Sequence, residues 1–116
     1  MAWLHVVDGI SIELRGDYED KSKIEEAPKY KDFEKKLQDI GCMLGSEVNE
    51  DDEISFFAGV EMLESRNIYQ GQTKVIGSKG WPDGFEDIAK EFKVFLEESG
   101  LEIISSQHGI ILSCFD

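Results

Sequence analysis

The chain has 116 residues, of which 41% are hydrophobic, and carries a formal net charge of −13 at pH 7. The length fits a single domain, residues 1–116, and the apolar content excludes a disordered chain. The charge excludes nucleic acid and anionic membranes as partners, because the field of the protein repels both.

The first part of the chain predicts a hairpin followed by a helix. Apolar residues over 3–7 and 10–14 indicate two short strands, and Asp8-Gly9 between them is typical of a two-residue turn. Residues 16–27 are polar and charged, so we expect a surface loop that holds at most a short turn. Apolar residues at helical spacing then predict a helix over about 29–40.

The middle of the chain predicts an acidic loop and a second hairpin. Residues 45–52 are dense in acids and are expected to form the loop. Apolar side chains alternate over 54–62, which predicts a strand, and a weaker strand is expected over about 68–76. Residues 77–82 have the glycine and proline content of a loop.

The last part of the chain predicts a helix and a closing hairpin. Asp83 is the expected N-cap of the helix, and Gly100 is the expected stop. Residues 101–105 and 110–115 indicate two strands around His108-Gly109. The expected fold is α+β in the order ββ-α-ββ-α-ββ, an antiparallel sheet with two helices packed on one face.

No catalytic or metal-binding motif is found in the sequence. The acids after Asn49 have the density of a calcium loop, but the glycine and glutamate positions of an EF-hand fall on Ile54 and Val60. The two cysteines and two histidines lack the spacing of zinc ligands, and no phosphate loop or nucleophile elbow occurs. We therefore predict a protein that is not an enzyme and uses no metal or cofactor.

The location expected from the sequence is the cytoplasm. No apolar run reaches the length of a membrane span, and the first residues lack the basic and apolar regions of a signal peptide. Cys42 and Cys114 are too few for a disulfide framework, so we expect two buried thiols in a reducing compartment.

The acidic stretch is the candidate binding site. Residues 37–73 contain eight acids against Arg66 alone. Crowded carboxylates repel one another, and a cationic partner would relieve that repulsion. The predicted partner-binding residues are Glu47, Glu50, Asp51, Asp52, Glu53, Glu61, Glu64 and Trp81. The alternatives are that the acids only keep the surface soluble and that Trp81 only covers the core.

These features favour an immunity or antitoxin-type inhibitor that neutralises a basic, nuclease-like toxin. Nucleases carry basic clefts for phosphates, and a rigid acidic surface can occupy such a cleft. An assembly subunit whose charge only maintains solubility stays open as an alternative.

A second hypothesis is the binding of a small molecule. Residues 54–61, Lys79-Gly80 and 92–100 resemble the GyrI-like effector-binding domains. The resemblance implies repeated hairpin–helix units and a hydrophobic cation held against a buried glutamate, for which it suggests Glu61. The Glu-x-Tyr ending of that family is absent from residues 109–116.

Overall fold

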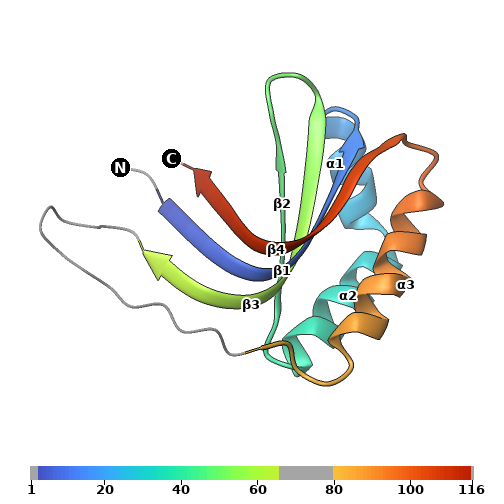
Figure 1. Ribbon diagram of the computed structural model, residues 1–116. Coiled ribbons are helices and arrows are strands. Elements are labelled where there is room, and N and C mark those ends of the chain that lie inside the picture. The colour runs from blue at the N-terminus through green and yellow to red at the C-terminus, as the bar shows by residue number, and fades with distance from the viewer. Residues whose placement is uncertain (1–2, 66–79, 116) are drawn as a thin grey trace, which may run out of the picture.

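The computed structural model describes residues 3–65 and 80–115, which form an α+β domain with one antiparallel sheet (Figure 1). In chain order the elements are β1 (Trp3–Arg15), α1 (Tyr18–Glu26), α2 (Pro28–Asp39), β2 (Met43–Val48), β3 (Glu53–Ser65), α3 (Phe85–Glu97) and β4 (Ile103–Phe115). Within the described residues the sheet has four strands in the order β2-β3-β1-β4, all paired antiparallel. This connectivity is the split β-α-β arrangement of ferredoxin-like sheets with one added helix. The predicted α+β class and antiparallel sheet are confirmed.

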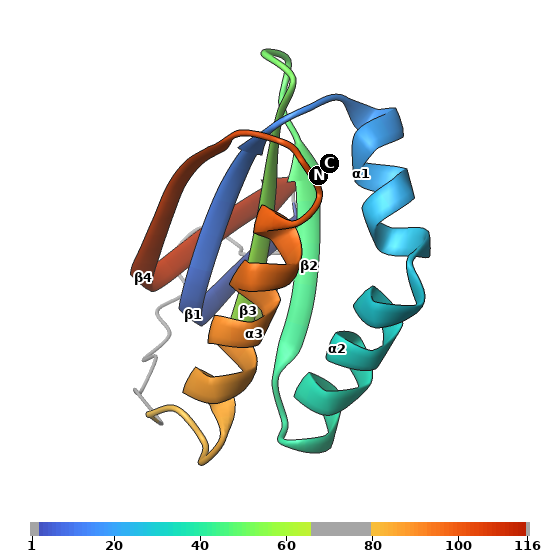
Figure 2. The ribbon, with the colours of Figure 1, turned by 90° about the vertical axis from the view of Figure 1, so that its right-hand side faces the viewer.

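The core lies between the helices and one face of the sheet. Helices α2 and α3 cross that face together (Figure 2) and bring four of their aromatic rings into contact, those of Tyr30, Phe33, Phe92 and Phe95. The centroids of Phe33 and Phe92 are 5.3 Å apart, and Phe56 of β3 lies 6.0 Å from Phe92. On β1 the alternate residues Ile12 and Leu14 are fully buried against the helices, so the intervening residues point to the opposite face.

Three helices, rather than the expected two, lie on this side of the sheet in the described residues (Figure 1). The extra helix is α1, and the prediction of a loop over 16–27 was wrong. Asp17 and Asp20 form a reciprocal capping box at its start, and Lys21 pairs with Glu25 one turn on, at 2.8 Å. Only Ile24 of α1 is buried, so the helix has no apolar stripe from which a sequence pattern could detect it.

Strands β1 and β4 are continuous where the sequence predicted two hairpins. The expected turns at Asp8-Gly9 and His108-Gly109 were wrong, because Gly9 pairs with Gly59 on one side and with Gly109 on the other. A Cβ atom on Gly9 would lie 2.7 Å from the Cα atom of Gly59, so these strands approach more closely than side chains allow. Strands β1, β3 and β4 appear as arcs whose hollow side faces away from the helices (Figure 1), and glycines inside strands are typical of such bends. We call that side the concave face.

The boundaries of the other helices and strands differ less from the predicted ones. The helix predicted over about 29–40 is α2, with Pro28 at its first position, and the strand predicted over 54–62 lies within β3. The expected loop over 45–52 is partly strand β2, whose residues are all half-buried. Helix α3 begins after Gly84, which adopts a left-handed φ of 89°, so the prediction of Asp83 as the cap was wrong. The strand expected over about 68–76 lies outside the described residues.

Candidate functional site

The turn between β2 and β3 carries four of the predicted partner-binding acids in a hydrogen-bonded loop. The side-chain oxygen of Asn49 accepts the backbone N–H groups of Asp51 and Glu53, at 2.9 and 3.0 Å. The side-chain amide of Asn49 donates to the Glu53 carboxylate at 3.0 Å. Asp52 completes the turn with a φ of 56°, a conformation that short polar side chains tolerate. The exposed carboxylates of Glu50, Asp51 and Asp52 therefore project from a fixed backbone.

This turn is tied to the start of α1, which is also acidic. The N–H of Gly16 donates to the carbonyl oxygen of Asp52 at 2.8 Å. The next residue, Asp17, caps α1, and the backbone N–H of Asp20 lowers the pKa of its carboxyl below the ordinary value. We call the group formed by the turn and the start of α1 the acidic end. Its carboxylates are Asp17, Asp20, Glu50, Asp51, Asp52 and Glu53.

Among the described residues, no basic side chain forms an ion pair with the acidic turn. Arg15 is the register partner of Glu53 on β1, but its guanidinium pairs with Glu102 at 3.0 Å. Across residues 3–65 and 80–115, no ion pair within 4.0 Å involves Glu50, Asp51, Asp52 or Glu53. Within the described residues, the carboxylates of the acidic end thus lie at one end of the strands without an ion pair.

Glu47 does not belong to the acidic end and lies on the concave face. Its carboxylate accepts a hydrogen bond of 2.7 Å from the hydroxyl of Ser113 on β4. Glu61 is on the same face of the sheet, because it lies an even number of positions along β3 from Ser55, the register partner of Glu47. Glu13, which was not among the predicted site residues, pairs with Ser55 from β1 and adds a third half-buried carboxylate to this face.

Trp81 lies on the opposite side of the sheet from Glu47. Its half-buried indole donates its N–H to the carboxylate of Asp8 at 3.0 Å. Asp8 lies seven positions before Arg15, which flanks the acidic end, and seven positions of β1 correspond to about 23 Å of strand. Glu64 belongs to β3, but its side chain lies outside the described part of the chain. The predicted residues therefore fall into separate groups, of which the acidic end is the largest.

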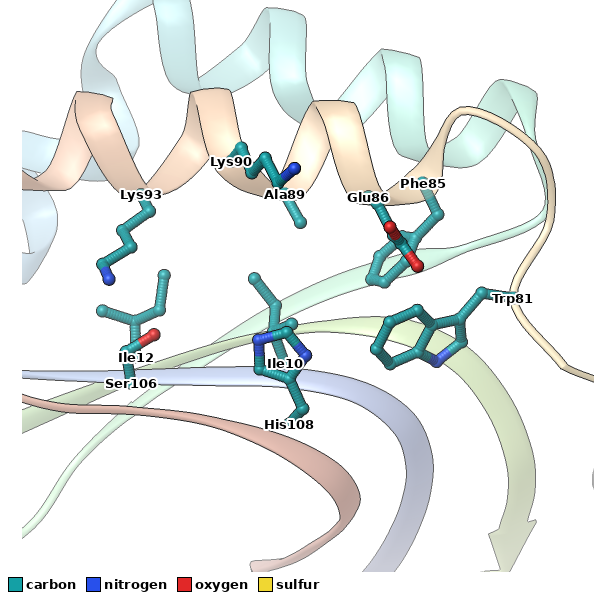
Figure 3. A pocket seen from close by; sticks show the side chains of 10 residues that line it. All are labelled: Ile10, Ile12, Trp81, Phe85, Glu86, Ala89, Lys90, Lys93, Ser106 and His108. Carbon is teal, nitrogen blue, oxygen red and sulfur yellow. The ribbon is translucent and has the colours of Figure 1, made fainter.

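A cleft of about 260 Å³ between α3 and the strands β1 and β4 was not predicted (Figure 3). Its apolar wall consists of Ile10, Ile12, Trp81, Phe85 and Ala89, and its polar lining consists of Glu86, Lys90, Lys93, Ser106 and His108. These residues come from three segments that only the folded sheet brings together. The sequence pattern places His108 in a turn and gives Lys90 and Lys93 no role, so no local pattern indicates a shared site.

The thiols and acids of the described residues offer no metal site or reactive cysteine. Cys42 is buried, as predicted, and burial raises the pKa of its thiol. The side chain of Cys114 lies outside the described part. No group of three or more cysteine, histidine or acidic side chains in residues 3–65 and 80–115 could hold a metal ion.

Within the same ranges, none of the helices has the length and apolar content to cross a membrane.

Comparison with protein-family models, with curated proteins and with solved structures finds no match for this chain.

Proposed function

We propose that this domain is a non-enzymatic binding protein of the immunity or antitoxin type, which neutralises a basic, nuclease-like toxin in the cytoplasm. The observation that supports this proposal best is the acidic end. It presents Glu50, Asp51 and Asp52 on a turn that Asn49 holds by hydrogen bonds, and no basic side chain of the described residues pairs with them.

The fixed geometry of the turn favours binding. A flexible acidic loop loses conformational freedom when it binds, whereas a turn held by its own hydrogen bonds has lost much of that freedom already. Carboxylates on such a turn can meet the lysine and arginine side chains that line a phosphate-binding cleft. Carboxylates then occupy the active site of the nuclease in place of the phosphates, and the nuclease cannot hydrolyse them.

The net charge of −13 adds a kinetic argument. Complementary charge raises association rates by roughly 10–10³-fold, and this gain falls as salt screens the field. Fast capture matters for an inhibitor of a toxin. The half-buried acids of the concave face, Glu13 and Glu47, extend the negative potential beyond the acidic end.

The test measures inhibition of purified basic toxin nucleases, with lysozyme as a basic protein that is not a nuclease. A triple variant, E50Q/D51N/D52N, removes three charges from the turn. The control D32N/D39N/D87N removes the same number of exposed charges from α2 and α3, and α2 ends and α3 begins on the side of the molecule opposite the β2–β3 turn (Figure 1).

We expect the protein to bind and inhibit at least one nuclease at 50 mM salt, and the affinity to fall at least tenfold by 300 mM salt. The triple variant should lose about tenfold or more in affinity, and the control should stay within about threefold. Inhibition that is insensitive to salt, or equal losses in the two variants, would contradict the proposed role of the acidic end. The absence of inhibition across the panel would contradict the toxin assignment.

A further inference from the structure

The cleft beside α3 has a charge opposite to that of the molecule as a whole. Lys90 and Lys93 line it beside His108, and Glu86 is the one acid among its lining residues. In the described part of the chain, neither lysine lies within 4.0 Å of a carboxylate. Two ammonium groups beside an apolar floor are suited to an anion that also has an apolar body.

The two ends of the cleft differ in chemistry. Figure 3 shows Lys93 reaching from α3 toward Ile12 and Ser106 on the strands, whereas Trp81 and Phe85 lie at the other end. An acid group at the first end would meet an ammonium and a hydroxyl, both of which donate hydrogen bonds. An apolar ring at the second end would meet two aromatic side chains.

The aromatic end is held in place by the protein itself. The indole N–H of Trp81 is bound to Asp8 at 3.0 Å, so the polar edge of the ring is already occupied. The ring packs edge-on against Phe85, with centroids 5.2 Å apart, and lies 5.7 Å from the ring of His108. Trp81 therefore offers an aromatic surface of fixed orientation rather than a hydrogen-bond donor.

We propose that this cleft binds a small aromatic carboxylate, with its ring against Trp81 and its acid group at Lys93 and Ser106. The volume of about 260 Å³ is just below the range of about 300–1,000 Å³ for drug-sized ligands. It therefore suits one ring system with a short acid arm. This binding activity is separate from the proposed inhibition and uses a different part of the molecule.

The lining favours an anion over the cation that the GyrI-like resemblance implies. A hydrophobic cation needs a buried carboxylate, but Glu86 is exposed and two lysines share the cleft with it. The net charge of −13 repels anions at long range. Salt screens that repulsion over about 8 Å at physiological ionic strength, whereas contact with an ammonium acts at about 3 Å.

The test is a titration followed by amide chemical shifts in solution. The probes are benzoate, 3-phenylpropionate and indole-3-acetate, each compared with its neutral amide, and 3-phenylpropylamine serves as the cationic probe. We expect at least one carboxylate to bind with a millimolar or lower Kd and to shift the amides of Trp81, Lys93 and Ser106. Its amide should bind about tenfold more weakly, because it lacks the charge that the lysines recognise.

The variant Lys93→Gln should weaken carboxylate binding about tenfold, since it replaces the ammonium with a neutral amide. Lys31→Gln removes the same charge from an exposed position on α2, away from the cleft, and should change the affinity less than twofold. Both lysines are exposed, so both variants are expected to fold. The proposal would be overturned if none of the three carboxylates at 10 mM changed the amide chemical shifts, if the amine bound more tightly than the carboxylates, or if the two variants changed the affinity equally.

Discussion

The hydroxyl of Ser113 donates a hydrogen bond of 2.7 Å to the carboxylate of Glu47, and the two residues lie on opposite edges of the sheet. Strands β2 and β4 are separated by β3 and β1, so they can touch only because the sheet folds over its concave face. Ser113 is 5% exposed, and Phe57, equally buried, lies on the same face of the sheet as Glu47. The curvature of the strands brings the two edges of the sheet together at Glu47 and Ser113.

Removal of the Ser113 hydroxyl should destabilise the fold. Ser113→Ala leaves the half-buried Glu47 carboxylate without this donor, and hydrogen bonds to charged groups contribute about 1.5–3 kcal/mol. We expect the free energy of unfolding in urea to fall by about that amount. Glu47→Gln should cost less, about 1 kcal/mol, because the amide oxygen still accepts the bond. A Ser113→Ala protein within about 0.5 kcal/mol of the wild type would show that this contact does not hold the edges together.

The line of glycines makes a second prediction. In Gly9→Ala the new methyl group would meet backbone atoms of β3, including the Cα of Gly59 at 2.7 Å and the carbonyl oxygen of Ala58. Backbone atoms in a paired strand cannot move aside without breaking the sheet. We therefore expect a loss of more than about 3 kcal/mol in unfolding free energy, above the usual cost of overpacking.

Gly45 provides the matched comparison for Gly9. A Cβ atom there would lie 2.5 Å from the nearest ring carbon of Phe57, which is a side chain and can turn within its site. Gly45→Ala should cost about 1–3 kcal/mol in the same urea titration. Equal losses of unfolding free energy in the two variants would mean that the close approach of the backbones at Gly9 has no special importance for stability.

The same glycines explain why the sequence predicted the class of fold but not its strands. Asp8-Gly9 and His108-Gly109 have the composition of two-residue turns, yet here Gly9 permits a close approach to a strand about 50 positions away. The pairing of Gly9 with Gly59 joins residues far apart in the chain, so the local sequence does not show that these strands continue through the glycines. In contrast, α2 and β3 follow patterns that their own residues determine, and those predictions were confirmed apart from shifts at the ends.

The two candidate sites also differ in how far the sequence predicts them. The acidic end is largely a local feature, because four of its carboxylates lie together between Asn49 and Ile54. Its link to α1 required the structure, since it depends on the bond from Gly16 to Asp52. The cleft could not be predicted, because its lining joins β1, β4 and the segment from Trp81 to Lys93.

A third prediction concerns the turn of the acidic end. Asn49→Ala removes the acceptor of two backbone N–H groups without changing the net charge. We expect a loss of about 1 kcal/mol in unfolding free energy and faster hydrogen exchange at the amide of Glu53. Gln38→Ala, which removes an exposed amide from α2, should change neither quantity. Unchanged exchange at Glu53 in the Asn49 variant would contradict the role of Asn49 in holding the turn.

A fourth prediction concerns alkaline pH. Tyr30 is 5% exposed, and burial, followed by the negative charges of Glu25 and Glu34, raises the pKa of its phenol. The folded state therefore holds this proton more strongly than the unfolded state does. The stability that this proton contributes is complete below the ordinary pKa of about 10 and is lost as pH rises above it. At one pH unit above that value, the free energy of unfolding should be lower by about 1.4 kcal/mol.

The measurement compares unfolding free energies at pH 8 and pH 11 in the wild type and in Tyr30→Phe. Phenylalanine keeps the ring contacts with Phe56 and Phe92 but has no proton to lose. The wild type should therefore lose about 1.4 kcal/mol more than this variant over the interval. Tyr18→Phe is the control, because Tyr18 is 70% exposed, and it should lose as much stability as the wild type. Equal pH dependence in the wild type and Tyr30→Phe would mean that the buried phenol does not couple folding to alkaline pH.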